Sequence, residues 1–222
     1  MATSDGERPV LLDLFCGAGG AAMGYYRAGF RVVGVDMQPQ PRYPFEFHQA
    51  DALTFPLDGF DVIHASPPCQ AHSRISQNLG YASRHADLLP QTRARLMSSC
   101  APWIMENVSG APMPAAMVLC GSMFGLGIPE LGWYVQRHRQ FESSHILFTR
   151  AACHHVGLAI SVVGNGTPKY LRDRIGRTFT AAEARRLLDI DWMSRAELSQ
   201  AIPPAYTEWI GRQLLAALRN AA

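Results

Sequence analysis

A glycine-rich turn between an apolar run and a helical stretch constrains the fold of this chain more than any other feature. Residues 11–20 read Leu-Leu-Asp-Leu-Phe-Cys-Gly-Ala-Gly-Gly, and a helical stretch over residues 21–28 follows. Glycine lets a backbone approach a ligand closely, and a helix start offers free N–H groups. A second apolar run ends in Asp36, 19 residues after Gly17. A carboxylate at this spacing can accept hydrogen bonds from ribose hydroxyls, so the order of elements predicts a nucleotide-type cofactor site.

Apolar runs alternate with helical stretches along the first half of the chain. The runs at residues 10–15, 31–36, 60–65 and 102–106 are typical of strands, and residues 85–99 are typical of a helix. Alternation of this kind predicts an α/β fold with a mostly parallel twisted sheet flanked by helices. The chain has 222 residues, of which 48% are hydrophobic and 17% charged, which indicates a folded domain with a substantial core.

The tetrapeptide Pro67-Pro68-Cys69-Gln70 places one thiol just after the third of these apolar runs. Open α/β sheets carry their chemistry at the carboxyl ends of their strands, and two prolines stiffen the turn there. Cys69 is therefore a candidate nucleophile. The alternative, a cysteine that serves only as a small core residue, suits Cys16, Cys100 and Cys120 better.

Five segments of the chain, in this order, resemble the cytosine-C5 methyltransferases, which transfer a methyl group from S-adenosylmethionine to cytosine in DNA. They are residues 13–20, 66–70 (Ser-Pro-Pro-Cys-Gln), 106–108 (Glu-Asn-Val), 136–139 (Gln-Arg-His-Arg) and 201–204 (Ala-Ile-Pro-Pro). Residues 119–125 with the Arg-His-Arg element resemble a compact branch of the family that phages and prophages carry. The resemblance implies a Rossmann-like class I S-adenosylmethionine-dependent fold, in which the last helix packs back on the cofactor-binding core.

The resemblance assigns the catalytic chemistry to four residues, Cys69, Glu106, Arg137 and Arg139. Addition of the Cys69 thiolate to cytosine C6 pushes electron density to C5, which then attacks the methyl group. Glu106, kept neutral by burial, would donate to cytosine N3, while Arg139 would contact O2 and support Glu106. Arg137, two residues earlier, is predicted on the same face of a strand as Arg139, and the resemblance implies that it helps to hold the substrate backbone or the catalytic loop. Because the ring cannot be reached inside a duplex, the base has to flip out.

The cofactor contacts implied in the same way lie at the ends of the first strands and beside the nucleophile. They are Phe15, Gly17, Gly19, Gly20, Asp36, Met37, Asp51 and Pro67. Asp36 would accept from the ribose hydroxyls, Met37 would pack on the adenine, and Asp51 would accept from the adenine amino group. Asp51 is also compatible with a helix cap.

Three residues are expected on the substrate side of the site. Gln70 and Ser73 would fill the gap left by the flipped base or contact the phosphate, and Asn107 would hold the Glu106 carboxyl or its loop in place. The polar stretch from residue 70 to residue 89 is interpreted in its first half as a mobile loop over the site.

The chain is expected to form one compact domain in three parts. Residues 1–142 are the predicted cofactor-binding and catalytic core, residues 143–179 a reduced target-recognition segment, and residues 180–222 helices that pack back on the core. Thr180 with Glu183 and Ser194 with Glu197 are capping boxes, which predict two helix starts. Because the recognition segment is too short for an independent domain, sequence selectivity should be short or relaxed.

Basic residues are concentrated between Arg137 and Arg186, where nine cations face three acids, although the whole chain has a net charge of only +2. A local excess of this kind suits a phosphate-facing surface, and it is also compatible with a solvated face that acids elsewhere balance. We expect double-stranded DNA as the partner. RNA or a free cytidine nucleotide as the substrate, or DNA binding without catalysis, are the alternatives.

The cysteine pattern and the apolar pattern both favour a cytoplasmic protein, in a bacterium or a phage-infected host. Five scattered cysteines argue for reduced thiols, residues 1–9 lack a signal-peptide pattern, and no apolar run is long enough to cross a membrane. We expect a monomer with no membrane partner.

A metal site is not favoured by the sequence. The triplet Cys153-His154-His155 raises zinc as a hypothesis, but no second ligand pair stands at zinc-finger spacing. S-adenosylmethionine without a metal ion is therefore the expected cofactor. His72 and His138 are interpreted as solvated polar side chains.

Overall fold

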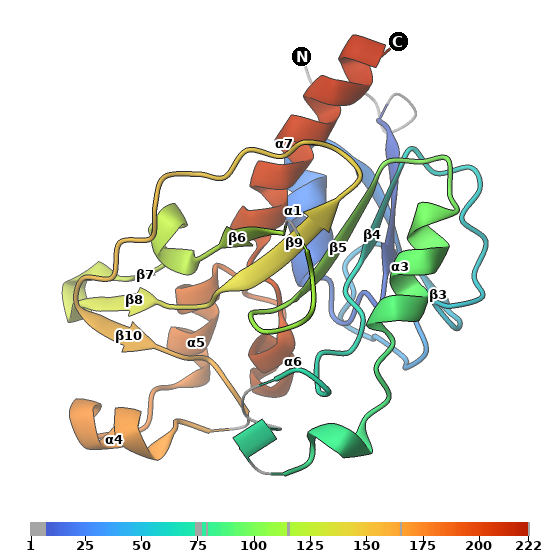
Figure 1. Ribbon diagram of the computed structural model, residues 1–222. Coiled ribbons are helices and arrows are strands. Elements are labelled where there is room, and N and C mark those ends of the chain that lie inside the picture. The colour runs from blue at the N-terminus through green and yellow to red at the C-terminus, as the bar shows by residue number, and fades with distance from the viewer. Residues whose placement is uncertain (1–7, 74–76, 79, 115, 165, 222) are drawn as a thin grey trace.

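The computed structural model describes residues 8–73, 77–78, 80–114, 116–164 and 166–221, and shows a seven-stranded main sheet with a three-stranded sheet beside it (Figure 1). The strands of the main sheet, in chain order, are β1 (Val10–Leu14), β2 (Arg31–Asp36), β3 (Glu46–Gln49), β4 (Val62–Ala65), β5 (Trp103–Val108), β6 (Met117–Leu119) and β9 (Arg139–Ser143). Their order across the sheet is β3-β2-β1-β4-β5-β9-β6.

The first five strands of this sheet are parallel, and β9 runs antiparallel to both β5 and β6. The chain moves outward from β1 to β2 and then returns to the other side of β1 to form β4. The carboxyl ends of β1 and β4 therefore flank a point where the strand order reverses, and ligands of open α/β sheets bind at such points. This confirms the predicted α/β class with a mostly parallel sheet.

Alternate residues of the central strands face two different cores. Leu11, Val62 and Ile104 pack with α1 (Gly20–Ala28) and α7 (Pro204–Ala221) on one face. Their chain neighbours Leu12 and Ile63 pack on the other face with α3 (Leu89–Met97). Because side chains on a strand alternate between faces, continuous apolar runs such as these are expected of strands covered by helices on both sides.

Close contact between α1 and α7 ties the C-terminal helix to the cofactor half of the sheet. A Cβ atom added at Gly24 would lie 2.0 Å from the Thr207 hydroxyl and 2.1 Å from the Pro204 carbonyl oxygen. The Thr207 hydroxyl donates to the Ala21 carbonyl at 2.8 Å. The last helix therefore packs back on the core, as the resemblance implied.

The three-stranded sheet contains β7 (Gly127–Ile128), β8 (Trp133–Val135) and β10 (Leu158–Ile160), in the order β10-β8-β7. It forms a core of its own with α4 (Lys169–Ile175), α5 (Ala181–Leu188) and α6 (Arg195–Gln200). Two of its strands precede residue 143, so this part of the molecule takes in residues that the sequence analysis assigned to the core. Both predicted capping boxes are present, at Thr180 and at Ser194.

The largest difference from the predicted elements is the start of α3. The predicted helix began at residue 85, but α3 begins at Leu89, with Pro90 in its first turn and the Asp87 carboxylate accepting from the Leu89 N–H at 3.0 Å. Residues 82–84 form instead the short 3₁₀ helix η2 (Ala82–Arg84). Proline lacks an N–H and is tolerated only in the first turn of a helix, so α3 starts next to Pro90 and not at residue 85.

Two sequence-based expectations concern residues that the structure does not describe. The absence of a signal-peptide pattern concerns mainly residues 1–7, and residues 74–76 and 79 belong to the segment interpreted as a loop over the site. In the part of the chain that is described, no helix combines the length and the apolar character needed to cross a bilayer.

Candidate active site

The turn after β1 is built by backbone conformations that few residues adopt. Phe15 has φ 58°, and Gly17 and Gly19 have φ 48° and 84°. A left-handed conformation is unusual for a bulky residue such as Phe15 and marks a locally constrained turn. The Gly17 N–H donates to the Asp36 carboxylate at 3.0 Å, so the acid at the end of β2 holds the glycine turn in place.

Three predicted cofactor residues lie along the ends of β2 and β3. The second Asp36 oxygen accepts from the Gln38 N–H at 2.9 Å, and each oxygen keeps a further lone pair for a ribose hydroxyl. Met37, next to it, is 60% exposed and leaves an apolar side chain open to a flat ring. Asp51 accepts from the Leu53 N–H at 2.9 Å and so closes a turn at residues 52–54, not the helix start that the sequence left open for it.

Asp13 is a buried acid that sequence reasoning passed over. Its side chain is 1% exposed, and the Tyr43 hydroxyl is the hydrogen-bonding group beside it. Burial raises its pKa well above the ordinary value, and the nearby Asp36 raises that pKa further. The signal was present in the sequence, as one acid inside the apolar run Leu-Leu-Asp-Leu that leads into the glycine turn.

The C-terminal region closes over the glycine turn. A Cβ at Gly20 would lie 2.5 Å from the Ile202 carbonyl oxygen, so only glycine allows this close approach. The Trp192 indole donates to the Ala18 carbonyl at 2.8 Å. The pocket expected around the turn is therefore completed by residues about 180 positions later in the chain.

The loop that carries Cys69 is anchored from two sides. The fully buried Asn107 amide donates to the Pro67 carbonyl at 3.1 Å, and the Asn107 oxygen accepts from the Val108 N–H. Asn107 thus holds the loop of the nucleophile. The His72 N–H donates to the Cys69 carbonyl at 3.0 Å, and the His72 ring lies 2.9 Å from the Asp87 carboxylate. His72 is therefore not the solvated side chain that the sequence suggested.

Two further residues of this loop were expected to meet the substrate. Gln70 is half-buried, and its amide oxygen is without a hydrogen-bond partner in the described part of the chain. Ser73 is half-buried as well and lies at the last described position before residue 74. A buried acceptor such as the Gln70 oxygen is costly unless a ligand or water satisfies it.

Glu106 and Arg139 form a buried ion pair at the carboxyl end of β5. The Arg139 Nε atom lies 3.0 Å from Glu106 Oε1, and the Glu106 side chain is 7% exposed. Burial raises the pKa of Glu106, while Arg139, Arg137 and a hydrogen bond from Ser66 lower it, and the net direction is upward. Burial also raises the pKa of Cys69, Glu106 raises it further, and Arg139 opposes this change. Thiol and acid are therefore close enough to influence each other's ionisation.

Arg137 lies just before β9 and not within it, which differs from the shared strand face that the sequence predicted. Its guanidinium donates to the Val162 carbonyl at 2.8 Å and to the Ser199 carbonyl at 2.7 Å. Burial lowers its pKa to about 9, and the neighbouring Arg139 contributes to this. Arg137 therefore joins the β10 side of the small sheet to the C-terminal segment.

A buried chain of hydrogen bonds leads from Tyr25 through His64 and Ser66 to Glu106. The His64 ring contacts the Tyr25 hydroxyl at 2.9 Å through Nδ1 and the Ser66 hydroxyl at 2.8 Å through Nε2. Ser66 in turn hydrogen-bonds Glu106. His64 is completely buried, and burial lowers its pKa to about 3. Sequence reasoning missed His64, although one histidine within an apolar strand was the available signal.

The basic segment between Arg137 and Arg186 is partly neutralised in the fold. Lys169 pairs with Asp173 on α4, Arg177 pairs with Glu183, and Arg186 pairs with Glu130. Arg172 and Arg174 are exposed on the last turn of α4. Both interpretations of the basic segment, as a phosphate-facing surface and as a solvated face that acids balance, thus retain support.

Comparison with known proteins gives one family. Residues 10–114 match the sequence model of the C-5 cytosine-specific DNA methylases. These residues contain the glycine turn, Cys69 and Glu106, and the match confirms the resemblance that the motifs indicated. No curated protein matches the sequence significantly. Membership of a compact phage branch stays a prediction.

Solved structures confirm the fold. A proposed DNA modification methyltransferase encoded within a prophage of E. coli has a TM-score of 0.61 at 16% identity, covering 95% of this chain and 99% of that one. The Dnmt2 methyltransferase of S. pombe has a TM-score of 0.58 at 14% identity, with 96% and 99% covered. The Entamoeba histolytica methyltransferase EhMeth has a TM-score of 0.56 at 12% identity, with 96% and 99% covered. At these identities the likeness shows the fold alone.

Proposed function

Because residues 10–114 match the sequence model of the C-5 cytosine-specific DNA methylases, we propose that this chain transfers a methyl group from S-adenosylmethionine to C5 of cytosine in double-stranded DNA. The observation that carries the proposal is the arrangement at the carboxyl ends of β4 and β5. There Asn107 holds the loop of Cys69, and Glu106 forms a buried pair with Arg139. Structural relatives described as methyltransferases support the same reading of the fold.

The residues around the glycine turn fit the cofactor. Gly17 has open space beside its Cα for close approach, Asp36 presents lone pairs to ribose, and Met37 offers an exposed apolar surface to adenine. The buried Asp13 carboxyl group, on the strand that leads into the same turn, suits a cationic amino group, through bound water or directly. When bound, S-adenosylmethionine supplies an electrophilic methyl group.

Cys69 and Glu106 together activate the cytosine ring. The Cys69 thiolate adds to C6 of the flipped base while Glu106, whose raised pKa favours the neutral acid, donates to N3. Arg139 holds the Glu106 carboxyl and contributes positive charge beside O2 as the ring gains electron density. After transfer, the C5 proton leaves to water and Cys69 is eliminated, which restores the thiolate.

The raised pKa of Cys69 has a consequence for catalysis. In the protein alone the thiol is protonated at neutral pH, because burial and Glu106 both disfavour the thiolate. The thiol proton therefore has to leave to water as Cys69 attacks C6, while Glu106 donates its own proton to N3. Thiolate formation is therefore coupled to substrate binding, which protects the thiol from other electrophiles.

The test measures transfer of labelled methyl groups to duplex DNA, tRNA and dCMP. We expect transfer to duplex DNA, loss of transfer in Cys69→Ala, and unchanged transfer in Cys100→Ala, since Cys100 is exposed and lies after α3, outside the site. Methylation of tRNA or dCMP alone would replace DNA as the substrate. DNA binding without any transfer would instead show a silent relative.

A second measurement addresses the covalent step and the flipped base. A duplex with 5-fluorocytosine at the target cannot release its proton from C5, so the adduct with Cys69 should accumulate and survive denaturation. A protein that methylates DNA but forms no such adduct would contradict the role given to Cys69. Bisulfite sequencing of DNA from cells that express the protein would give the target context.

A further inference from the structure

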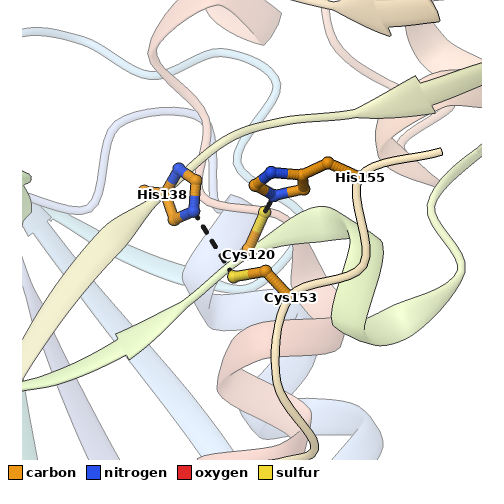
Figure 2. A group of neighbouring side chains, drawn as sticks. All are labelled: Cys120, His138, Cys153 and His155. Atoms are coloured by element: carbon orange, nitrogen blue, oxygen red, sulfur yellow. Dashed lines mark hydrogen bonds between the residues drawn. The ribbon is translucent and has the colours of Figure 1, made fainter. Parts of the chain in front are cut away.

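Four side chains with metal-binding atoms meet beside the small sheet, outside the site described above (Figure 2). They come from distant parts of the chain: Cys120 follows β6, His138 lies between β8 and β9, and Cys153 and His155 belong to the connection from β9 to β10. One ligand atom from each residue lies within 4.8 Å of all the others. We propose that these four residues bind one structural Zn²⁺ ion.

The distances within the cluster fit a tetrahedral ion. Zn–S bonds of about 2.3 Å and Zn–N bonds of about 2.0–2.1 Å place tetrahedral ligand atoms roughly 3.3–3.8 Å apart. Cys120 Sγ lies 3.4 Å from His155 Nε2, and Cys153 Sγ lies 3.4 Å from His138 Nε2. Both imidazoles thus turn the same nitrogen toward the sulfur atoms, as Figure 2 shows.

The chemistry of the ligand set selects the metal. Two thiolates and two neutral imidazoles in a tetrahedral arrangement favour zinc, and two thiolates balance its charge. Calcium and magnesium prefer oxygen ligands, which the cluster does not offer. Because all four positions are taken by protein atoms, the site is of the closed, structural type.

Neighbouring groups orient the ligands in the way that metal sites require. The Ser122 hydroxyl donates to Cys120 Sγ at 3.5 Å, and the His154 N–H donates to the same hydroxyl at 3.2 Å. The His155 ring stacks on Tyr134 of β8, with centroids 5.6 Å apart and an interplanar angle of 16°. Such outer contacts fix the position of ligand atoms and tune their basicity.

The position of the cluster indicates what the ion does. It fastens the long connection from β9 to β10 against the end of β6, next to the small sheet. His138 stands between Arg137 and Arg139, the two arginines assigned to the chemistry. Zinc therefore stabilises the join between the two sheets and fixes the strand entry from which Arg139 reaches Glu106.

The sequence alone did not favour this site, because only Cys153, His154 and His155 are close together in the chain. The other two ligands lie 15 and 33 residues before Cys153, at no recognised finger spacing, and the fold brings them together. Of the triplet, His154 does not take part, since its backbone N–H and not its ring contacts the cluster.

The experiment measures metal content in the full-length protein, purified without added chelator. We expect about one zinc per chain by elemental analysis, and loss of most of it in Cys153→Ser and in His155→Gln. His154→Gln and Cys100→Ser are the matched controls, since they change a histidine and a cysteine outside the cluster, and both should keep the metal. Equal zinc in the His155→Gln variant would overturn the proposal.

A second measurement on the unchanged protein covers the case in which the variants do not fold. Replacing zinc by Co²⁺ should give the visible absorption of tetrahedral cobalt with thiolate ligands, and a chelator should lower the melting temperature until zinc, but not magnesium, is restored. A protein that takes up neither ion contradicts the site. An intact mass two units low, from a disulfide between Cys120 and Cys153, contradicts it as well. None of these readouts depends on methyl transfer.

Discussion

At the scale of single residues, the decisive feature is one buried acid among cations whose pKa is raised. Glu106 contacts Arg139, yet burial outweighs the arginine and its pKa is raised above the ordinary 4.5. A group with a raised pKa in the folded state binds protons more tightly than in the unfolded state. Stability should therefore fall as the pH rises from 4.5 through the folded pKa.

Replacement of Glu106 by glutamine should show this directly. The stability of Glu106→Gln relative to the unchanged protein should rise with pH across that window, because the amide does not ionise. Methyl transfer should fall by about 10²-fold or more, since the amide cannot give up a proton. Urea unfolding at several pH values measures the first effect, with the exposed Glu46→Gln as the control. A flat difference across pH would show that Glu106 ionises in the fold as it does in solution.

The pKa of His64 is shifted in the opposite direction to that of Glu106, so its contribution to stability changes with pH in the opposite sense. Burial lowers its pKa to about 3, so between pH 6.5 and about pH 3 this histidine binds a proton in the unfolded chain and not in the folded protein. Its contribution to stability is present above pH 6.5 and is lost toward pH 3, at about 1.4 kcal/mol per unit within the window. His64→Gln should be less stable at neutral pH and lose less on acidification. Unfolding midpoints from pH 7 to pH 4 test this, with the exposed His85→Gln as the control, and parallel curves for His64→Gln and the unchanged protein would contradict it.

At the scale of secondary-structure elements, the join between α1 and α7 depends on the absence of one side chain. A methyl group at Gly24 would overlap the Thr207 hydroxyl and the Pro204 carbonyl, and the two helices would have to separate. Overpacking of this kind costs roughly 1–3 kcal/mol or more. Gly24→Ala should therefore lower the melting temperature, whereas Gly166→Ala, with nothing within 4 Å of its added Cβ, should not. Equal melting temperatures would mean that α7 is not seated against α1.

Local patterns predicted elements well where the signal is contained in a few neighbouring residues. The capping boxes at Thr180 and Ser194 form as predicted, because a box needs only residues three apart. The predicted start of α3 was wrong, because Pro90 determines where the helix begins and the polar residues before it show no strong helical periodicity. Arg137 was placed on a strand because it stands two residues from Arg139, yet tertiary contacts with Val162 and Ser199 set its direction.

At the scale of the whole molecule, contacts between residues far apart in the chain determine the features that the sequence did not predict. The motifs predicted which residues belong to the site, and their catalytic and binding roles stay predictions. Ile202 over Gly20 and Trp192 on Ala18 join segments at opposite ends of the chain, and the cluster around Cys120 joins residues up to 35 positions apart. Neither hydrophobic periodicity nor motif spacing predicts such contacts, since they depend on how two sheets and their helices pack.

The small sheet with α4 is the part of the molecule best placed to contact a polyanion. Arg172 and Arg174 are exposed there, and α4 lies at the opposite end of the molecule from the C-terminal end of α7 (Figure 1). Each phosphate contact lowers the slope of log K against log salt by about 0.9 for duplex DNA. The double variant Arg172→Gln/Arg174→Gln should therefore bind DNA more weakly and lose roughly 1–2 units of that slope.

Fluorescence anisotropy with a labelled duplex over a range of salt concentrations measures both quantities. Arg212→Gln on α7 is the matched control, because Arg212 is an exposed arginine paired with Glu208 on the helix that covers the other end of the sheet. If both variants kept the slope of the unchanged protein, the cations of α4 would be a solvated face balanced by acids such as Asp173 and Glu183, and DNA would approach the Cys69 loop from another side. A less negative slope for the α4 variant alone would place the phosphate backbone across the small sheet.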